Sequence, residues 1–167
     1  MSLTLAADMA ALADVEIQDF LKRYAPRSFR GVFSCDQFRS EQFYFLPIAV
    51  VVNALPSTVE MGHWSAIYVD VNRNGTWFDS FGLRPWGEFN SFLAKNSINA
   101  SFNTKLLQKD EISCGYHAIF FICQMDKGRS LEDVLALYRS HTCDTHDLMV
   151  QSYYNKRKPY VQTIKRR

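Results

Sequence analysis

Apolar residues along the chain follow two spacings, which predict helices near both ends and strands between them. Helical spacing of apolar residues predicts helices over four segments: 14–24, 89–95, 131–139 and 145–154. Short runs rich in aromatic and β-branched residues predict strands over four others: 43–52, 64–71, 76–79 and 102–107. Residues 114–125 are strongly apolar and contain no proline, which is typical of a buried helix. This order predicts an α+β fold in which helices pack against a mostly antiparallel or mixed sheet.

Length and composition fit one folded domain that spans residues 1–167. The longest apolar run, 43–55, is interrupted by Pro47 and Asn53 and is too short to cross a bilayer, so we expect no membrane partner. The first residues lack the basic start and the continuous apolar stretch of a signal peptide. We therefore expect an intracellular protein that is not secreted.

Charge is distributed unevenly along the chain. Residues 151–167 hold six basic residues and no acidic one, whereas the rest carries a net charge of about −4. We treat 155–167 as a basic C-terminal tail. Clustered lysine and arginine favour weak binding of nucleic acid, but a solvated terminus without a partner fits the same pattern.

The four cysteines, Cys35, Cys114, Cys123 and Cys143, match neither a disulfide scaffold nor a paired zinc motif. We therefore expect free thiols. His141 and His146 flank Cys143 and could bind zinc together with it, but a fourth ligand is not evident. We predict no metal and no cofactor.

Cys114 stands where a polar loop passes into the predicted buried helix. The free N–H groups and the dipole at a helix N-terminus favour a thiolate, and the same N–H groups can bind an oxyanion. Gly115 allows a substrate backbone to approach closely. Gln108 lies six residues before Cys114, where a side-chain amide can supply a second oxyanion donor; taken alone, it also fits a solvated loop residue.

His63 begins one predicted strand, and Asp79 ends the next. Neighbouring strands can bring an imidazole and a carboxylate together, and that contact orients the ring. A two-residue Asn74-Gly75 turn would instead pair Asp79 with Asp70, roughly 23 Å from His63 at the usual strand rise. The pair therefore requires a wider turn, a bulge or strong twist. A lone histidine is otherwise more often structural.

Two further residues lie close to these in the sequence. Trp64 follows His63 directly and either shields the site or packs in the core. His117 lies one helical turn after Cys114, where we expect a packed helix histidine rather than a catalytic one.

Together, His63-Trp64, Asp79, Gln108 and Cys114-Gly115 resemble the adenain-type (adenovirus endopeptidase) and Ulp-type (SUMO protease) cysteine proteases. The resemblance also includes the segment 78–82 and covers about residues 14–140 in order and spacing. It implies a papain-like, circularly permuted fold in which the histidine precedes the cysteine. It also implies peptide-bond hydrolysis through an acyl-enzyme.

The resemblance gives each residue a role. Cys114 is the nucleophile, His63 the base, Asp79 the residue that orients His63, and Gln108 an oxyanion donor, while Trp64 and Gly115 contact substrate. We expect a viral or virus-like maturation protease whose protein substrates are capsid precursors, cut after small residues such as glycine.

Three alternatives remain open from the sequence. The first is a protease that removes ubiquitin-like proteins such as SUMO. The second is an effector-type acetyltransferase, since those enzymes share a histidine–acid–cysteine arrangement. The third is a binding module without activity.

Overall fold

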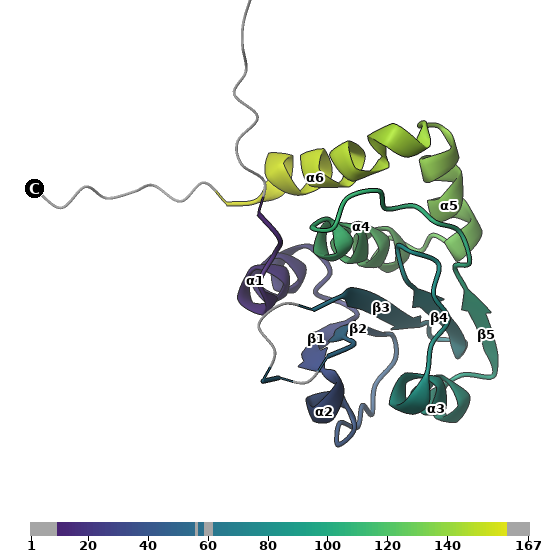
Figure 1. The fold of residues 1–167 in the computed structure, drawn as a ribbon. Coiled ribbons are helices and arrows are strands. Elements are labelled where there is room, and N and C mark those ends of the chain that lie inside the picture. The colour runs from purple at the N-terminus through teal and green to yellow at the C-terminus, as the bar shows by residue number, and fades with distance from the viewer. Residues whose placement is uncertain (1–9, 56, 59–61, 160–167) are drawn as a thin grey trace, which may run out of the picture.

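The computed structural model describes residues 10–55, 57–58 and 62–159, and in these residues five strands form one mixed sheet (Figure 1). The strands follow sequence order across the sheet: β1 (Phe29–Ser34), β2 (Ile48–Asn53), β3 (Trp64–Val69), β4 (Asn74–Phe78) and β5 (Asn99–Phe102). The two outer pairs are parallel and the two inner pairs antiparallel. The α+β class and the mixed sheet expected from the sequence are thereby confirmed.

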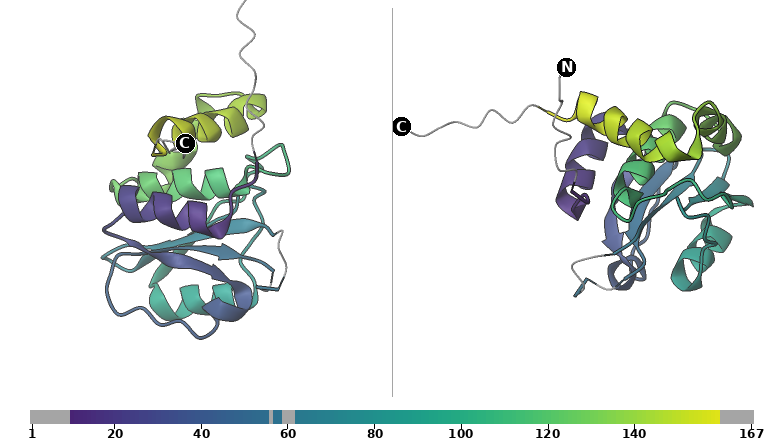
Figure 2. Two further views of the ribbon diagram at one scale, coloured as in Figure 1. Left: turned by 90° about the vertical axis from the view of Figure 1, so that its left-hand side faces the viewer. Right: turned by 45° about the horizontal axis from the view of Figure 1, so that its top comes forward.

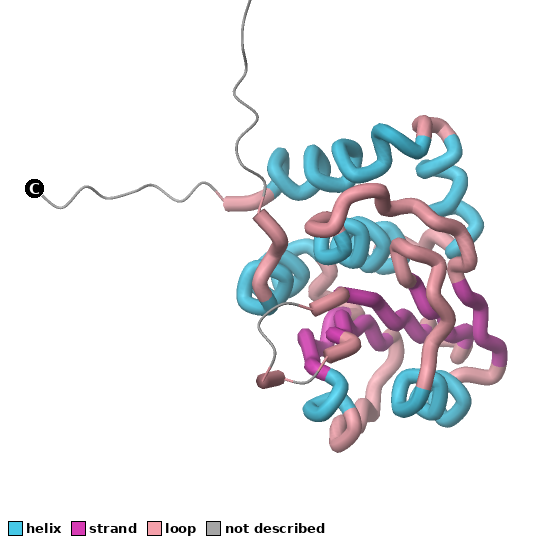
Figure 3. The backbone as a smooth tube through the Cα atoms, in the orientation of Figure 1, coloured by secondary structure: helices cyan, strands magenta, loops and turns pink. Residues whose placement is uncertain are grey.

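Helices cover both faces of this sheet (Figures 1 and 2). They are α1 (Asp14–Tyr24), α2 (Cys35–Phe38), α3 (Gly87–Asn96), α4 (Cys114–Asp126), α5 (Leu131–Arg139), the 3-10 turn η1 (Cys143–Thr145) and α6 (His146–Arg157). α1 and α4 lie on one face, and α6 lies outside α4. α2 and α3 lie on the other face, so the backbone forms stacked layers with the sheet inside (Figure 3).

Alternation along β2 explains how one strand serves two hydrophobic cores. Ala49 and Val51 point to the core shared with α1 and α4, whereas Val50 and Val52 point to the core beneath α2 and α3. Every residue of β2 is buried because both faces are covered. α4 is buried over nearly its whole length, between the sheet and α6, as its apolar sequence predicted.

Several predicted boundaries differ from the structure. The run 43–52 forms a strand only from Ile48 onward, because Pro47, which follows Leu46 through a cis peptide bond, ends a preceding loop. β5 lies before most of the predicted strand 102–107; that connection instead donates the amide hydrogens of Leu107 and Gln108 to the carbonyl of Ser80. β1 was not predicted at all.

The hairpin between β3 and β4 settles the strand register. Its turn is organised by Asp70, whose carboxylate accepts hydrogen bonds from the backbone of Asn72 and Asn74, while Arg73 adopts a left-handed φ of 62°. Asn74 and Gly75 are therefore the first residues of β4 rather than the turn. Because Ala66 pairs with Phe78, the next pairing places Asp79 opposite Ser65, two residues from His63.

The C-terminal tail predicted at 155–167 begins inside α6, whose last residues are Asn155–Arg157, and residues 160–167 lie outside the described part of the chain. None of the helices in the described residues combines the length and apolar character that crossing a membrane requires.

Candidate active site

The structure brings His63 and Asp79 into direct contact. His63 Nε2 lies 2.6 Å from Asp79 Oδ2, a distance typical of a charge-assisted hydrogen bond. The His63 side chain keeps 21% of its surface exposed, whereas the Asp79 side chain is fully buried. The imidazole therefore lies between a buried carboxylate and solvent, just before the first residue of β3.

Neighbouring side chains and amides hold the Asp79 carboxylate in place. The Ser65 hydroxyl donates to Oδ2 at 2.7 Å, and the Phe81 amide donates to Oδ1 at 2.8 Å. The ring of Phe81 stacks on His63 with centroids 5.0 Å apart. Asn103 donates to the backbone oxygen of Asp79 at 2.7 Å. Sequence reasoning missed these supports, although Ser65 could have been found once the strand pairing was known.

The electrostatics of the pair favour a charged His63. Burial by itself would lower its pKa, but hydrogen-bonding and electrostatic interactions with Asp79 and Cys114 raise the pKa of His63 to about 9. Burial opposes ionisation of Asp79, yet its bonds to His63, Ser65 and Phe81 hold the pKa of that carboxyl below its usual value. The pair is thus an imidazolium facing a carboxylate, with Cys114 as the second partner of the imidazole.

Cys114 is the first residue of α4 and is 5% exposed. The first hydrogen bond within this helix runs from the His117 amide to the Ser113 carbonyl, so the Cys114 amide precedes the helical ladder. An amide at this position makes no hydrogen bond within the helix and can donate to a negative atom held beside the sulfur.

The side chain of Gln108 is buried, not solvated, and contacts the loop that leads to Cys114. Ser80 donates its hydroxyl to Gln108 Oε1 at 2.6 Å, and Gln108 Nε2 donates to the carbonyl of Asp110 at 2.8 Å. These two contacts fix which end of the amide is nitrogen. The second hydrogen on Nε2 is the one that an oxyanion donor would use.

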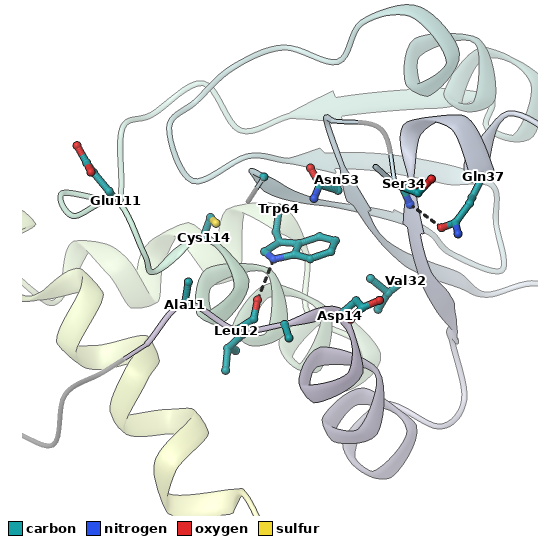
Figure 4. A pocket seen from close by; sticks show the side chains of 13 residues that line it. Ala11, Leu12, Asp14, Val32, Ser34, Gln37, Asn53, Trp64, Glu111 and Cys114 are labelled. Carbon is teal, nitrogen blue, oxygen red and sulfur yellow. Dashed lines mark hydrogen bonds between the residues drawn. The ribbon is translucent and has the colours of Figure 1, made fainter. Parts of the chain in front are cut away.

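A cavity of about 580 Å³ adjoins Cys114. Figure 4 shows Trp64 in its middle, Cys114 toward one end, and Ser34 and Gln37 toward the other. Trp64 Nε1 donates to the carbonyl of Leu12 at 3.1 Å, which fixes the indole as one wall of the cavity.

The position of Gly115 is explained by packing inside the protein. A Cβ atom on Gly115 would lie 3.2 Å from the Leu12 side chain and 3.3 Å from those of Ile17 and Trp64, closer than most real Cβ contacts. Glycine at this position therefore lets α4 pack closely against Leu12, Ile17 and Trp64. A role for Gly115 in contact with substrate remains a prediction.

The segment considered for metal binding is used for packing. His146 has its ring nitrogens 3.1 Å from the carbonyl of Leu107 and 2.9 Å from that of Tyr138. In the described part of the chain, no group of three or more metal-ligating side chains comes together. His117 is fully buried and contacts Asp147 and Tyr138, which agrees with the packed histidine expected.

No protein-family model matches this chain, and no curated protein matches it in sequence. Among solved structures it is similar to the ASFV pS273R protease, with a TM-score of 0.63 and 16% identity over 84% of this chain and 66% of that chain. It is also similar to the central domain of Lpg1148 from Legionella pneumophila, with a TM-score of 0.52 and 13% identity over 89% of this chain and 96% of that domain. The SUMO protease Ulp1 aligns with a TM-score of 0.48 and 13% identity over 89% of this chain and 81% of that chain.

The chain spans slightly less than two thirds of the length of the ASFV protease. Identities this low establish a common fold and nothing finer. On that basis, the chain has the fold of the ASFV pS273R protease. The fold class that the sequence predicted, a papain-like domain of the adenain/Ulp type, is confirmed.

Proposed function

We propose that this protein is a cysteine endopeptidase with Cys114 as nucleophile, His63 as base and Asp79 as the residue that orients His63. The observation that carries the proposal is the His63 ring, which contacts the buried Asp79 carboxylate and also interacts with Cys114 at the start of α4. Asp79 engages Nε2, which leaves Nδ1 to face the thiol. A thiolate–imidazolium pair is the activated form of such a nucleophile.

The geometry supports an acyl-enzyme mechanism. The Cys114 sulfur attacks the scissile carbonyl carbon, and the electron pair of the carbonyl moves to its oxygen. The Cys114 amide and Gln108 Nε2 donate hydrogen bonds to that oxyanion. The oxyanion then collapses, the C–N bond breaks and the imidazolium of His63 protonates the leaving amine. The neutral ring removes a proton from the water that attacks the thioester, and collapse of this second intermediate releases the acid product and the Cys114 thiolate.

The cavity beside Cys114 is the proposed binding site for the substrate chain. It runs along Trp64 and the segment Ala11–Asp14, so it is long enough for several residues on one side of the scissile bond. The indole of Trp64 lines this cavity together with Cys114, and we propose that its bulk favours small residues such as glycine next to the cleaved bond. The structural similarity to a viral protease supports protein precursors of a virus as the substrates, and we propose action inside an infected cell or a virion.

A peptide-library cleavage assay tests the proposal. The wild-type protein should cleave a subset of peptides with small residues before the scissile bond, and Cys114→Ala should abolish cleavage. Cys35→Ala is the control, because it removes another free thiol, on α2, and should leave cleavage unchanged. Hydrolysis confined to ubiquitin-like probes, or acetyl transfer from acetyl-CoA without hydrolysis, would replace the proposal by one of the alternatives. Full activity of Cys114→Ala would refute the mechanism.

Weak nucleic-acid binding by the basic tail belongs to the same proposal. Lys156, Arg157 and Lys158 stand at the end of α6, and Tyr24 at the end of α1 donates its hydroxyl to the backbone oxygen of Arg157. The last turn of α1 adds Lys22 and Arg23 to this basic end of the molecule. Binding should weaken steeply with salt and fall on truncation after Tyr154, which removes the whole basic tail. Equal DNA affinity of the truncated protein in fluorescence anisotropy would exclude a role for the tail.

A further inference from the structure

α6 presents two buried polar side chains to the loop that leads into Cys114. Asp147 and Gln151 lie one helical turn apart and are 8% and 7% exposed. Apart from His117 on α4, the partners named below lie in the segment 108–113. This segment carries the proposed oxyanion donor at one end and precedes the nucleophile at the other. The proposed mechanism uses neither side chain.

Asp147 holds the backbone of this loop with one oxygen and α4 with the other. Oδ2 accepts hydrogen bonds from the amides of Lys109 at 3.0 Å and Asp110 at 2.8 Å. Oδ1 accepts one from His117 Nε2 at 2.7 Å. A single carboxylate therefore ties the loop to the helix that begins at Cys114.

The protonation state of His117 follows from its partners. The carboxylate can only accept, so Nε2 carries the hydrogen, and Nδ1 accepts from the Tyr138 hydroxyl at 2.8 Å. Burial lowers the pKa of His117, even though Asp147 opposes that effect. Burial would raise the pKa of Asp147, but its bonds to His117 and to the two loop amides hold it below its usual value. The result is a neutral histidine that donates to an ionised carboxylate.

The contact reaches the oxyanion donor through Asp110. The Asp110 carbonyl accepts from Gln108 Nε2, so the position of the Asp110 backbone sets the direction of that amide. The Asp110 carboxylate accepts from the amides of Ile112 and Ser113 and from the Ser113 hydroxyl, and this hydroxyl also accepts from Gln151 Nε2 at 2.7 Å. The chain of contacts therefore runs from Asp147 through Asp110 to Gln108 on one side and to the residue before Cys114 on the other.

We propose that Asp147 is a positioning residue for the oxyanion site, which it sets by fixing the backbone of Lys109 and Asp110. This inference rests on the proposed protease function. Asp147 touches neither substrate nor the reacting atoms in this role. It acts on the step in which charge develops on the carbonyl oxygen, and not on the state of the thiol.

Asp147→Asn tests this separation. Asparagine has nearly the same shape, but its NH₂ group must face either His117 Nε2–H or the two loop amides, all of which are donors. We expect kcat to fall roughly 10²-fold, the order seen when catalytic groups are misplaced by about 1 Å or when one oxyanion donor is lost. KM should change by less than about twofold, because the cavity beside Trp64 is untouched.

Two chemical probes distinguish positioning from general damage. Alkylation of Cys114 by iodoacetamide, followed by peptide mass, requires the thiolate but no oxyanion site, and its rate should stay within about twofold of wild type. A peptide aldehyde forms a tetrahedral adduct that does need the site, and its affinity should fall together with kcat. Asp144→Asn is the matched control, because Asp144 pairs with the exposed side chain of Lys109 instead of with the loop backbone. It should leave all three measurements unchanged.

A double-mutant cycle with Gln108→Ala completes the test. If Asp147 acts through Gln108, the combined loss in kcat should be no greater than about the larger single loss. Additive losses, equal losses in alkylation and hydrolysis, or unchanged aldehyde affinity would overturn the inference while leaving the protease function standing. A wild-type protein that neither cleaves peptides nor binds aldehydes would remove both. If Asp147→Asn does not fold, Asp147→Glu keeps the carboxylate but displaces it, and the same pattern is expected.

Discussion

Replacement of Asp79 by asparagine should lower the alkaline pH at which the protein loses its peptidase activity. The imidazolium of His63 is the proposed donor to the leaving amine, so activity should fall as pH rises through the pKa of His63, which is about 9. Asparagine keeps the size of the side chain but removes the charge. It can also turn its NH₂ group toward His63, which disfavours the tautomer with hydrogen on Nε2.

The structure gives the size of the effect. The difference between the ordinary pKa of 6.5 and the value of about 9 corresponds to roughly 3 kcal/mol of stabilisation of the imidazolium. That stabilisation is shared between Asp79 and Cys114, and it acts against the burial of the ring. If Asp79 supplies half or more, the alkaline limb should fall by at least about one pH unit in Asp79→Asn.

The assay is kcat/KM for one peptide measured from about pH 6 to about pH 10, since this ratio reports ionisations of the free enzyme. Asp19→Asn is a suitable control, because it removes one negative charge from an exposed position on α1. The control should keep the alkaline limb of wild type. An alkaline limb near pH 9 in Asp79→Asn as well would show that the carboxylate does not set the charge of His63, and the electrostatic argument for the site would fail.

Three further predictions concern the stability of the fold, and each is measured by thermal or denaturant unfolding. Because the folded pKa of His63 is raised, its contribution is complete below pH 6.5 and lost as pH rises through about 9; wild type should therefore lose up to about 3 kcal/mol more than His63→Ala over that range. Gly82→Ala should cost about 2 kcal/mol, since Gly82 has a φ of 75° and a Cβ there would lie 2.8 Å from the Thr104 backbone. Ser130→Ala should cost about 1 kcal/mol without loss of activity, because its hydroxyl caps α5 by accepting from the Asp133 amide at 3.1 Å.

The buried helix and the capped helix were predictable because their signals are local. α4 begins at Cys114, as predicted, since the change from polar loop to apolar run occurs within two residues. α5 begins after Ser130 because serine at that position, three residues before an acidic side chain, satisfies the first amides of the helix.

The central hairpin shows where local reasoning stops. Asn74-Gly75 has the composition of a tight turn, yet the observed hairpin is centred on Asn72. Asp70 favours this earlier turn because one of its carboxylate oxygens accepts from the backbone amides of Asn72 and Asn74. That choice depends on side-chain geometry across four residues, which a dipeptide preference does not contain. It nevertheless decides the site, because the observed register brings Asp79 opposite Ser65 and within reach of His63.

β1 escaped prediction for a different reason. Its sequence, Phe29–Ser34, includes Arg30 and Gly31, and the register with β2 is irregular at that point. A glycine with an irregular pairing breaks the alternation by which a strand is recognised from sequence. The strand forms because β2 offers a fully buried edge that needs a hydrogen-bonded neighbour.

The described part of the chain contains two histidine–aspartate pairs with nearly equal distances, 2.6 Å for His63 and Asp79 and 2.7 Å for His117 and Asp147. They differ in burial: the His63 side chain is 21% exposed and that of His117 is fully buried. In the first pair the carboxylate and Cys114 outweigh the loss of solvent, and the pKa of the histidine rises; in the second, burial prevails and it falls. A histidine that must gain and lose a proton during turnover needs access to solvent and a reacting partner, whereas one that holds a loop in place works best with its proton fixed. The contact between the two residue types therefore does not by itself point to a catalytic pair; the thiol of Cys114 and the cavity beside it are what support the proposal that His63 and Asp79 are that pair.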